Sequence, residues 1–239
     1  MTKIDYNSWL SNGGVLQSSG TTGTPKQIEQ PVHKLVAANR AAIDAQQITR
    51  SSRIYTVCKT QHAGGLLAQT LPAYSIGAEV VVEDFNAYRF VREIHKYTHT
   101  HLTPDHARAV MGTKGFKDLS LKGVWVTCGS DRVTWDIIRA FVERGATFMA
   151  NWGMTEIGPV AINATYHNLE EVFYAQERAN AGTILGNTYY CNYKVENSIL
   201  HVKGDISVYG NTWYNTRDLV SQNLLGEMFY MGRKNAASV

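Results

Sequence analysis

Residues 18–26 form the segment whose side chains are best suited to bind a charged ligand. The segment reads Ser-Ser-Gly-Thr-Thr-Gly-Thr-Pro-Lys, with five hydroxyls, two glycines and a terminal cation. Glycine lets the backbone approach a ligand closely, and consecutive N–H groups and hydroxyls can donate to phosphate oxygens. The lysine adds a point charge for the same anion. We therefore expect a phosphate-binding loop formed by Ser18, Ser19, Gly20, Thr21, Thr22, Gly23 and Lys26.

This segment is not a phosphate loop of the GxxxxGK[ST] type, because Lys26 follows Pro25 and precedes Gln27. On composition alone, the alternative interpretation is a flexible turn rich in serine, threonine and glycine. The choice between the two depends on the rest of the sequence.

The string SSGTTGTPK resembles the phosphate-binding signature of the adenylate-forming superfamily, which includes acyl- and aryl-CoA synthetases, peptide-synthetase adenylation domains and luciferases. Further segments resemble other motifs of this superfamily and follow in the same order, so that the resemblance spans residues 14–235. They are residues 61–65 (QHAGG), 128–131 (CGSD), 151–156 (NWGMTE), 213–218 (WYNTRD) and 232–233 (GR). The sequences of the Gly-Met-Thr-Glu motif and of the segment around His62 look most like those of CoA ligases for aryl or fatty acids, such as o-succinylbenzoate–CoA ligase.

The resemblance implies a reaction in which a carboxylate oxygen attacks the α-phosphorus of ATP and expels pyrophosphate, giving an acyl-AMP. Such a step needs positioning and charge neutralisation more than covalent chemistry. The residues that would act on the phosphates are Lys26 and the rest of the loop, on the β- and γ-phosphates, and Thr155, on the α-phosphate. Glu156 would help to hold Mg²⁺, which prefers hard oxygen ligands. His62 would lie near the acyl pocket.

The resemblance also implies a nucleoside site. Gly129, Ser130 and Trp152 would line the adenine slot, where Trp152 replaces the usual tyrosine and keeps the stacking face. Asp218 would accept hydrogen bonds from the ribose hydroxyls, and Arg233 would reach the ribose or a phosphate. Asn151 and Gly153 flank Trp152 and are assigned to the same nucleotide site.

Alternating strand-like and helix-like segments must position these residues. The pattern predicts an α/β fold over residues 1–177, with a mostly parallel sheet flanked by helices. Ligands of such sheets bind at the carboxyl ends of the strands. Short aromatic and β-branched runs over residues 178–239 predict a small antiparallel β lobe. Strands are expected at residues 13–19, 53–58, 78–83, 121–129 and 146–151, and helices at 31–49, 62–77, 86–97 and 133–145.

Four histidines, His95, His99, His101 and His106, form a loose cluster in the sequence, with a spacing that fits no clear set of metal ligands. We expect them at solvated positions on helices and loops.

Composition excludes several function classes. The net charge is only +3 and the chain has no run of Lys or Arg, which gives no argument for nucleic-acid binding. Three widely spaced cysteines argue against a disulfide framework and a structural zinc site. The sequence contains no signal-peptide pattern and no apolar run of about 20 residues, so we expect a cytoplasmic protein without a membrane partner.

The sequence departs from the superfamily in three ways. It has only 17 residues before the phosphate loop, and it ends at the segment that resembles the family hinge, with Asn235 in place of an aspartate. We therefore expect a truncated core that lacks the family's N-terminal lobe and its C-terminal domain, which carries a lysine for the α-phosphate. Arg217 replaces the glycine before the ribose aspartate. Its side chain would either crowd the nucleotide or contact a phosphate.

Two functions follow from these observations. The chain is either an ATP/AMP-binding, Mg²⁺-dependent enzyme core that activates a carboxylic acid, or a catalytically impaired nucleotide-binding or interaction module. In either case a second copy of the chain or a separate protein is a candidate to complete it, because a missing packing lobe leaves an apolar face exposed.

Overall fold

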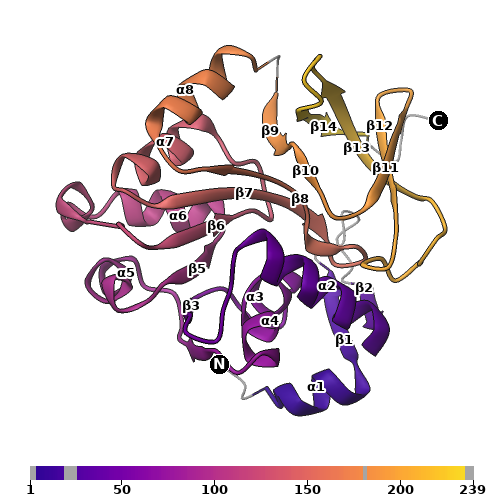
Figure 1. The fold of residues 1–239 in the computed structure, drawn as a ribbon, viewed down its shortest axis with the longest axis horizontal. Helices are drawn as coiled ribbons and strands as arrows, with labels where there is room; N and C mark the ends of the chain where they lie inside the picture. Colours follow the sequence, from indigo (N-terminus) through magenta and orange to yellow (C-terminus); the bar gives the residue numbers. More distant parts are fainter. Residues whose placement is uncertain (1–3, 19–25, 180–181, 235–239) are drawn as a thin grey trace.

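A computed structural model describes residues 4–18, 26–179 and 182–234. Its strands form a seven-stranded sheet, a five-stranded sheet and a two-stranded hairpin. Figure 1 shows the seven-stranded sheet running through the centre, with helices packed on it and the five-stranded sheet set against one end.

The seven-stranded sheet confirms the expected mostly parallel architecture. Its strand order is β10-β8-β7-β6-β5-β3-β4, with the five strands from β7 to β4 parallel, β8 antiparallel to β7, and β10 antiparallel to β8. The parallel strands are β3 (Arg53–Thr56), β4 (Glu79–Val82), β5 (His99–Leu102), β6 (Trp125–Cys128) and β7 (Thr147–Met154). The antiparallel strands are β8 (Gly158–Tyr166) and β10 (Thr188–Tyr189).

Helices cover both faces of this sheet. Successive side chains of each strand point to opposite sides, and both sides carry apolar residues that must be buried. Val126 and Phe148 pack with one helical layer, whereas their neighbours Trp125 and Met149 pack with the other. The first layer contains α5 (Ala87–Glu93), α6 (Pro104–Met111), α7 (Trp135–Glu143) and α8 (Leu169–Glu177). The second contains α2 (Val32–Ala45), α3 (Ala63–Leu67) and α4 (Thr70–Ser75).

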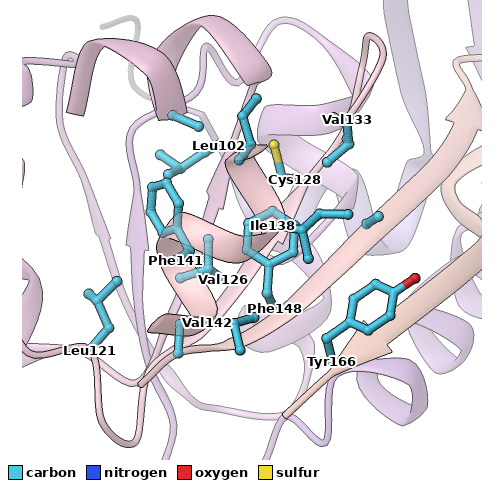
Figure 2. Close-up of a cluster of buried hydrophobic side chains, with 14 of the residues drawn as sticks. Leu102, Leu121, Val126, Cys128, Val133, Ile138, Phe141, Val142, Phe148 and Tyr166 are labelled. Carbon is cyan, nitrogen blue, oxygen red and sulfur yellow. The ribbon is translucent and has the colours of Figure 1, made fainter. Parts of the chain in front are cut away.

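The largest apolar cluster lies between the sheet and the first helical layer. Figure 2 shows Val126 and Phe148 from the strands facing Ile138 and Phe141 from α7. The rings of Phe141 and Phe148 lie 5.8 Å apart and are tilted by 52°. This packing fixes the strands whose carboxyl ends carry the predicted site residues.

The five-stranded sheet confirms the expected antiparallel β lobe. Its order is β11-β12-β13-β14-β9, with every pair antiparallel. The strands are β9 (Thr183–Gly186), β11 (Asn192–Glu196), β12 (Ile199–Lys203), β13 (Tyr214–Gln222) and β14 (Met228–Arg233). Between β9 and β11 the chain returns to the first sheet as β10, so the two sheets share one continuous segment. The boundary between the α/β core and the β lobe, placed between residues 177 and 178, stays a prediction.

A two-stranded hairpin flanks the predicted phosphate-binding loop. It pairs β1 (Gly14–Ser18) with β2 (Lys26–Gln30), and Ser18 is directly opposite Lys26. The N-terminal helix α1 (Tyr6–Asn12) precedes the hairpin. Loop residues Ser19, Gly20, Thr21, Thr22 and Gly23 lie outside the described residues.

The structure corrects the expectation of a single helix at residues 62–77. This segment forms two short helices, α3 and α4, separated at Gln69. The Gln69 side chain is buried, and its amide donates to the side chain of Gln46 and to the Thr100 carbonyl. The helix is thus interrupted where the Gln69 side chain makes these long-range hydrogen bonds.

The solvated positions expected for the histidines are wrong for two of them. His99 and His101 lie in β5 and are 7% and 4% exposed. The sequence His-Thr-His-Leu is too polar to predict a buried strand, yet all four residues of β5 are buried. In the described part of the chain, no group of three or more His, Cys, Asp or Glu side chains could hold a metal ion.

The three cysteines are free thiols, two of them buried. Among the described helices, none has the length and apolar character needed to cross a bilayer.

The packing in Figure 2 predicts the effect of removing one ring. Phe148→Ala leaves a cavity beside Phe141, so the free energy of unfolding should fall by about 3–5 kcal/mol. Phe173→Ala is the control, because Phe173 is 47% exposed on α8, and it should change stability by less than about 0.5 kcal/mol. Urea denaturation followed by circular dichroism measures both. Equal effects of the two variants would contradict the assigned core.

Candidate functional site

A cleft of about 1030 Å³ lies where the carboxyl ends of the parallel strands face the five-stranded sheet. Cys58, Thr103 and Ser130 line it just after β3, β5 and β6, and residues 151–154 line it at the end of β7. Residues of β9, β13 and β14 form the opposite wall. The cleft therefore occupies the place where open α/β sheets bind ligands.

The Asp218 side chain is a buried carboxylate on the cleft wall. It is 5% exposed on β13, and each of its oxygens has a protein donor. Trp152 Nε1 donates to Oδ2 at 3.0 Å, and Arg233 Nε lies 3.1 Å from Oδ1. Burial raises the pKa of Asp218 above its ordinary value, while Arg233 and the Trp152 hydrogen bond oppose this effect. Three predicted nucleotide residues thus form one contiguous group.

The turn between β7 and β8 places Thr155 and Glu156 on the cleft wall. Gly153 makes this turn possible, since a Cβ there would lie 2.0 Å from the Gly158 carbonyl oxygen. The pairing register shifts at the same point, between Trp152 and Met154. Glu156 is 8% exposed, and its backbone carbonyl accepts from Val208 N–H at 2.8 Å.

A fully buried lysine lies behind this turn. Lys34 Nζ donates to Gln30 Oε1 at 2.5 Å, and the Gln30 amide donates to the Thr155 carbonyl at 3.1 Å. Burial lowers the pKa of Lys34 to about 7, and the nearby Glu156 charge partly offsets that effect. The sequence analysis missed Lys34, because an amphipathic helix gives no signal that a lysine faces inward.

Gly129 and Asn151 pack against each other at the ends of β6 and β7. A Cβ on Gly129 would lie 2.4 Å from the Asn151 carbonyl oxygen. Gly129 does not itself line the cleft, whereas Ser130 and Asn151 do. The Asn151 amide donates to the Pro159 carbonyl, which leaves its buried Oδ1 without a hydrogen-bond partner among the described residues. This oxygen lies against Gly129.

The ends of the phosphate loop open onto the same cleft. Ser18 and Lys26 both line it, across the hairpin from one another. The remaining predicted loop residues lie outside the part of the chain that the structure describes.

His62 precedes α3 and lines the cleft with an exposed side chain. Beside it the wall contains Cys58, His101 and His106. The sequence analysis did not assign these three residues to the site, because they belong to no motif.

Arginines add positive charge to the cleft wall. Arg132 directly follows the 128–131 motif and stacks over the Tyr230 ring at 5.1 Å. Its position directly after that motif could have identified Arg132 as a candidate site residue. Arg217 lines the cleft with an exposed side chain and a φ of +63°, a backbone region that favours glycine. Its backbone is held by hydrogen bonds to the Asn215 side chain and to Lys234 N–H.

The chain is similar to proteins of a known enzyme family. The family described as AMP-binding enzyme matches residues 15–212. Indoleacetate–CoA ligase of Aromatoleum aromaticum is 32% identical over 153 residues, which cover 62% of this chain and 30% of that protein. The chain thus spans less than a third of the length of this curated relative.

Solved structures share the fold at lower identity. o-Succinylbenzoate coenzyme A synthetase from Bacillus subtilis, in complex with AMP, superposes with a TM-score of 0.76 at 18% identity, covering 94% of this chain and 50% of that one. An AMP-forming acyl-CoA synthetase-like protein from Dyadobacter fermentans gives 0.71 at 19% identity, covering 92% and 59%.

Lys34 predicts a pH dependence of stability. Its folded pKa of about 7 lies below the ordinary value of 10.5, so between these values the unfolded chain binds a proton that the folded chain does not. Stability therefore rises with pH in this window. Relative to Lys34→Met, the wild type should gain up to about 1.4 kcal/mol of unfolding free energy per pH unit from pH 7 to pH 9.

Urea denaturation at several pH values measures this difference. Lys122→Met, at an exposed position outside the cleft, is the matched control and should show no such slope. A difference between wild type and Lys34→Met that stays constant with pH would contradict the assignment.

Proposed function

The chain belongs to the AMP-binding enzyme family, and we propose that it binds ATP in this cleft and transfers the AMP moiety to the carboxylate of an organic acid. The observation that carries the proposal is the gathering of separate sequence segments on one cleft. Eleven predicted site residues line it: Ser18, Lys26, His62, Ser130, Asn151, Trp152, Gly153, Thr155, Glu156, Asp218 and Arg233.

The nucleoside would bind between β7 and the five-stranded sheet. Asp218 offers carboxylate oxygens to the ribose hydroxyls, and Trp152 and Arg233 fix the orientation of that carboxylate. The motifs that contain Asp218 and Arg233 lie beyond the segment that the family matches, so their roles rest on this geometry and on the resemblance.

The triphosphate would extend along the wall that carries Lys26 and Thr155. Glu156 supplies one buried carboxylate to this wall. This donor set fits Mg²⁺, which takes one or two carboxylates together with substrate phosphates and water. When bound, the ion would neutralise charge on the phosphate oxygens. Lys26 would hold the β- and γ-phosphates, and Thr155 would orient the α-phosphate.

In the reaction, a carboxylate oxygen of the acid forms a bond to the α-phosphorus, and the bond from that phosphorus to the bridging oxygen of pyrophosphate breaks. The chain contributes orientation and positive charge rather than a covalent intermediate. The acid would enter beside His62, on the side of the cleft formed by α3 and β5. Names of the relatives favour acyl or aryl acids, with coenzyme A as the later acceptor.

The nucleotide site is tested by binding. Asp218→Ala removes the ribose acceptor, and AMP affinity measured by calorimetric titration should fall about 10- to 100-fold, since hydrogen bonds to charged groups contribute about 1.5–3 kcal/mol. Asp118→Ala is the control, because Asp118 is exposed and outside the cleft. An unchanged AMP affinity in Asp218→Ala would contradict the proposed nucleoside site.

The activity is tested by pyrophosphate release from ATP and Mg²⁺ over a panel of carboxylic acids. We expect acid-dependent release, reduced about 100-fold or more in Glu156→Gln because one charge-stabilising group is lost. Glu170→Gln, at an exposed position on α8, should behave as wild type. AMP binding without release for any acid would instead favour the alternative, a nucleotide-binding module completed by a second copy or another protein.

A further inference from the structure

Gln30 and Lys34 form a buried polar pair behind the cleft. Gln30 ends β2 and is 1% exposed, and Lys34 lies in the first turn of α2 and is fully buried. Neither side chain lines the cleft in the described structure. Lysine is almost never fully buried in proteins, because its polar head then loses contact with water. The position of Lys34 therefore calls for an explanation.

The hydrogen bonds of this pair fix the orientation of the Gln30 amide. The amide nitrogen donates to the Thr155 carbonyl oxygen at 3.1 Å, and the amide oxygen accepts from Lys34 Nζ at 2.5 Å. A carbonyl oxygen can only accept, so the amide nitrogen must face Thr155 and the amide oxygen must face Lys34. Lys34 donates in its charged and in its neutral form, so this arrangement does not depend on its charge.

The bond from Gln30 to Thr155 joins two elements on which the proposed function depends. β2 begins at Lys26, which lines the cleft, and ends at Gln30. Thr155 belongs to the turn between β7 and β8 and also lines the cleft. Among the hydrogen bonds of the described residues, this is the one that connects β2 with that turn. The separation of the two elements therefore depends on it.

The β1–β2 hairpin needs such a link, because it belongs to neither large sheet. In the described structure, β1 and β2 pair with each other and with no strand of the two larger sheets. A two-stranded hairpin is at best marginally stable by itself. Leu16 of β1 is 2% exposed and packs in one apolar cluster with Leu35 of α2 and Leu66 of α3. Apolar packing is non-directional, so the direction comes from the Gln30 hydrogen bond.

The separation of the hairpin and the turn bears directly on the proposed reaction. A carboxylate oxygen forms a bond to the α-phosphorus while the bond to the pyrophosphate oxygen breaks, and these two oxygens must lie roughly in line. In the proposed function, Lys26 holds the leaving pyrophosphate and Thr155 orients the α-phosphate. A displacement of about 1 Å between reacting groups can lower the rate about 100-fold. A contact that fixes this separation therefore supports the chemical step.

We propose that Gln30 and Lys34 are positioning residues for the transfer of AMP to the acid. Gln30 holds the β1–β2 hairpin to the turn that carries Thr155 and Glu156, and Lys34 holds the Gln30 amide in the orientation that makes this bond. Both residues act through others and touch neither the nucleotide nor the acid. The inference rests on the proposed function and adds a buried link between its two phosphate-binding elements.

Steady-state kinetics separates positioning from binding. Gln30→Met nearly keeps the length of the side chain and removes both hydrogen bonds. With the most active acid of the panel, kcat for pyrophosphate release should fall about 10- to 100-fold, because the phosphates lose their alignment. The KM for ATP and the affinity for AMP should each change by less than about 3-fold, because ground-state binding is retained. Gln27→Met is the matched control, since Gln27 is exposed on the same strand and outside the cleft, and it should behave as wild type.

Two further variants separate the hydrogen bond to Thr155 from general packing. Gln30→Glu keeps an acceptor for Lys34 and loses the donor to Thr155, so its kcat should fall as in Gln30→Met. Lys34→Met leaves the Gln30 amide oxygen without its donor and should lower kcat in the same direction. Calorimetric titration of each variant with AMP verifies that the fold and the nucleoside site persist.

Hydrogen exchange followed by mass spectrometry reports on the turn without any turnover. The Ile157 N–H donates to the Met154 carbonyl oxygen at 3.1 Å within this turn. Loss of the bond from Gln30 should loosen the turn, so the peptide that contains Ile157 should exchange faster in Gln30→Met than in Gln27→Met.

A wild-type kcat in Gln30→Met or in Gln30→Glu, or equal losses of kcat and AMP affinity, overturns the inference while leaving adenylation by the wild type intact. Exchange of the turn that is as slow in Gln30→Met as in the control also overturns it. AMP binding by the wild type without pyrophosphate release for any acid overturns the proposed function and the inference together. These outcomes are therefore distinguishable.

Discussion

The burial of the Asp218 carboxylate is the constraint on which the cleft depends. Its partners come from both sheets, since Trp152 lies near the end of β7 in the first sheet and Arg233 ends β14 in the second. A buried carboxylate without partners is strongly destabilising, so the two sheets must keep the spacing that supplies both donors. That spacing sets the width of the cleft and the orientation of the carboxylate that we propose binds the ribose.

The other charges in the cleft follow a consistent pattern. Positive side chains at Lys26, Arg132 and Arg217 stand on its walls, and the carboxylates of Asp218 and Glu156 are both buried. Such an arrangement is consistent with the proposed binding of ATP together with one divalent cation.

The sequence could predict the parallel sheet, the antiparallel lobe and the residues gathered on the cleft, because each depends on local patterns or short motifs. It could not predict β5, whose polar residues are buried by tertiary hydrogen bonds such as His99 with Gln46. The break at Gln69 depends on the distant Thr100 carbonyl. The inward Lys34 donates to Gln30, which in turn binds the distant Thr155 carbonyl. Residues 19–23 of the phosphate loop lie outside the described structure, so their roles stay predictions.

Transfer of an oxygen atom from the acid to AMP tests the central claim most directly. A carboxylic acid labelled with ¹⁸O in its carboxyl group is incubated with ATP, Mg²⁺, the protein and hydroxylamine as acceptor, and the AMP formed is analysed by mass spectrometry. Attack of the carboxylate on the α-phosphorus predicts AMP that carries one ¹⁸O from the acid. AMP that carries only solvent oxygen would show hydrolysis of ATP by water and would contradict the account.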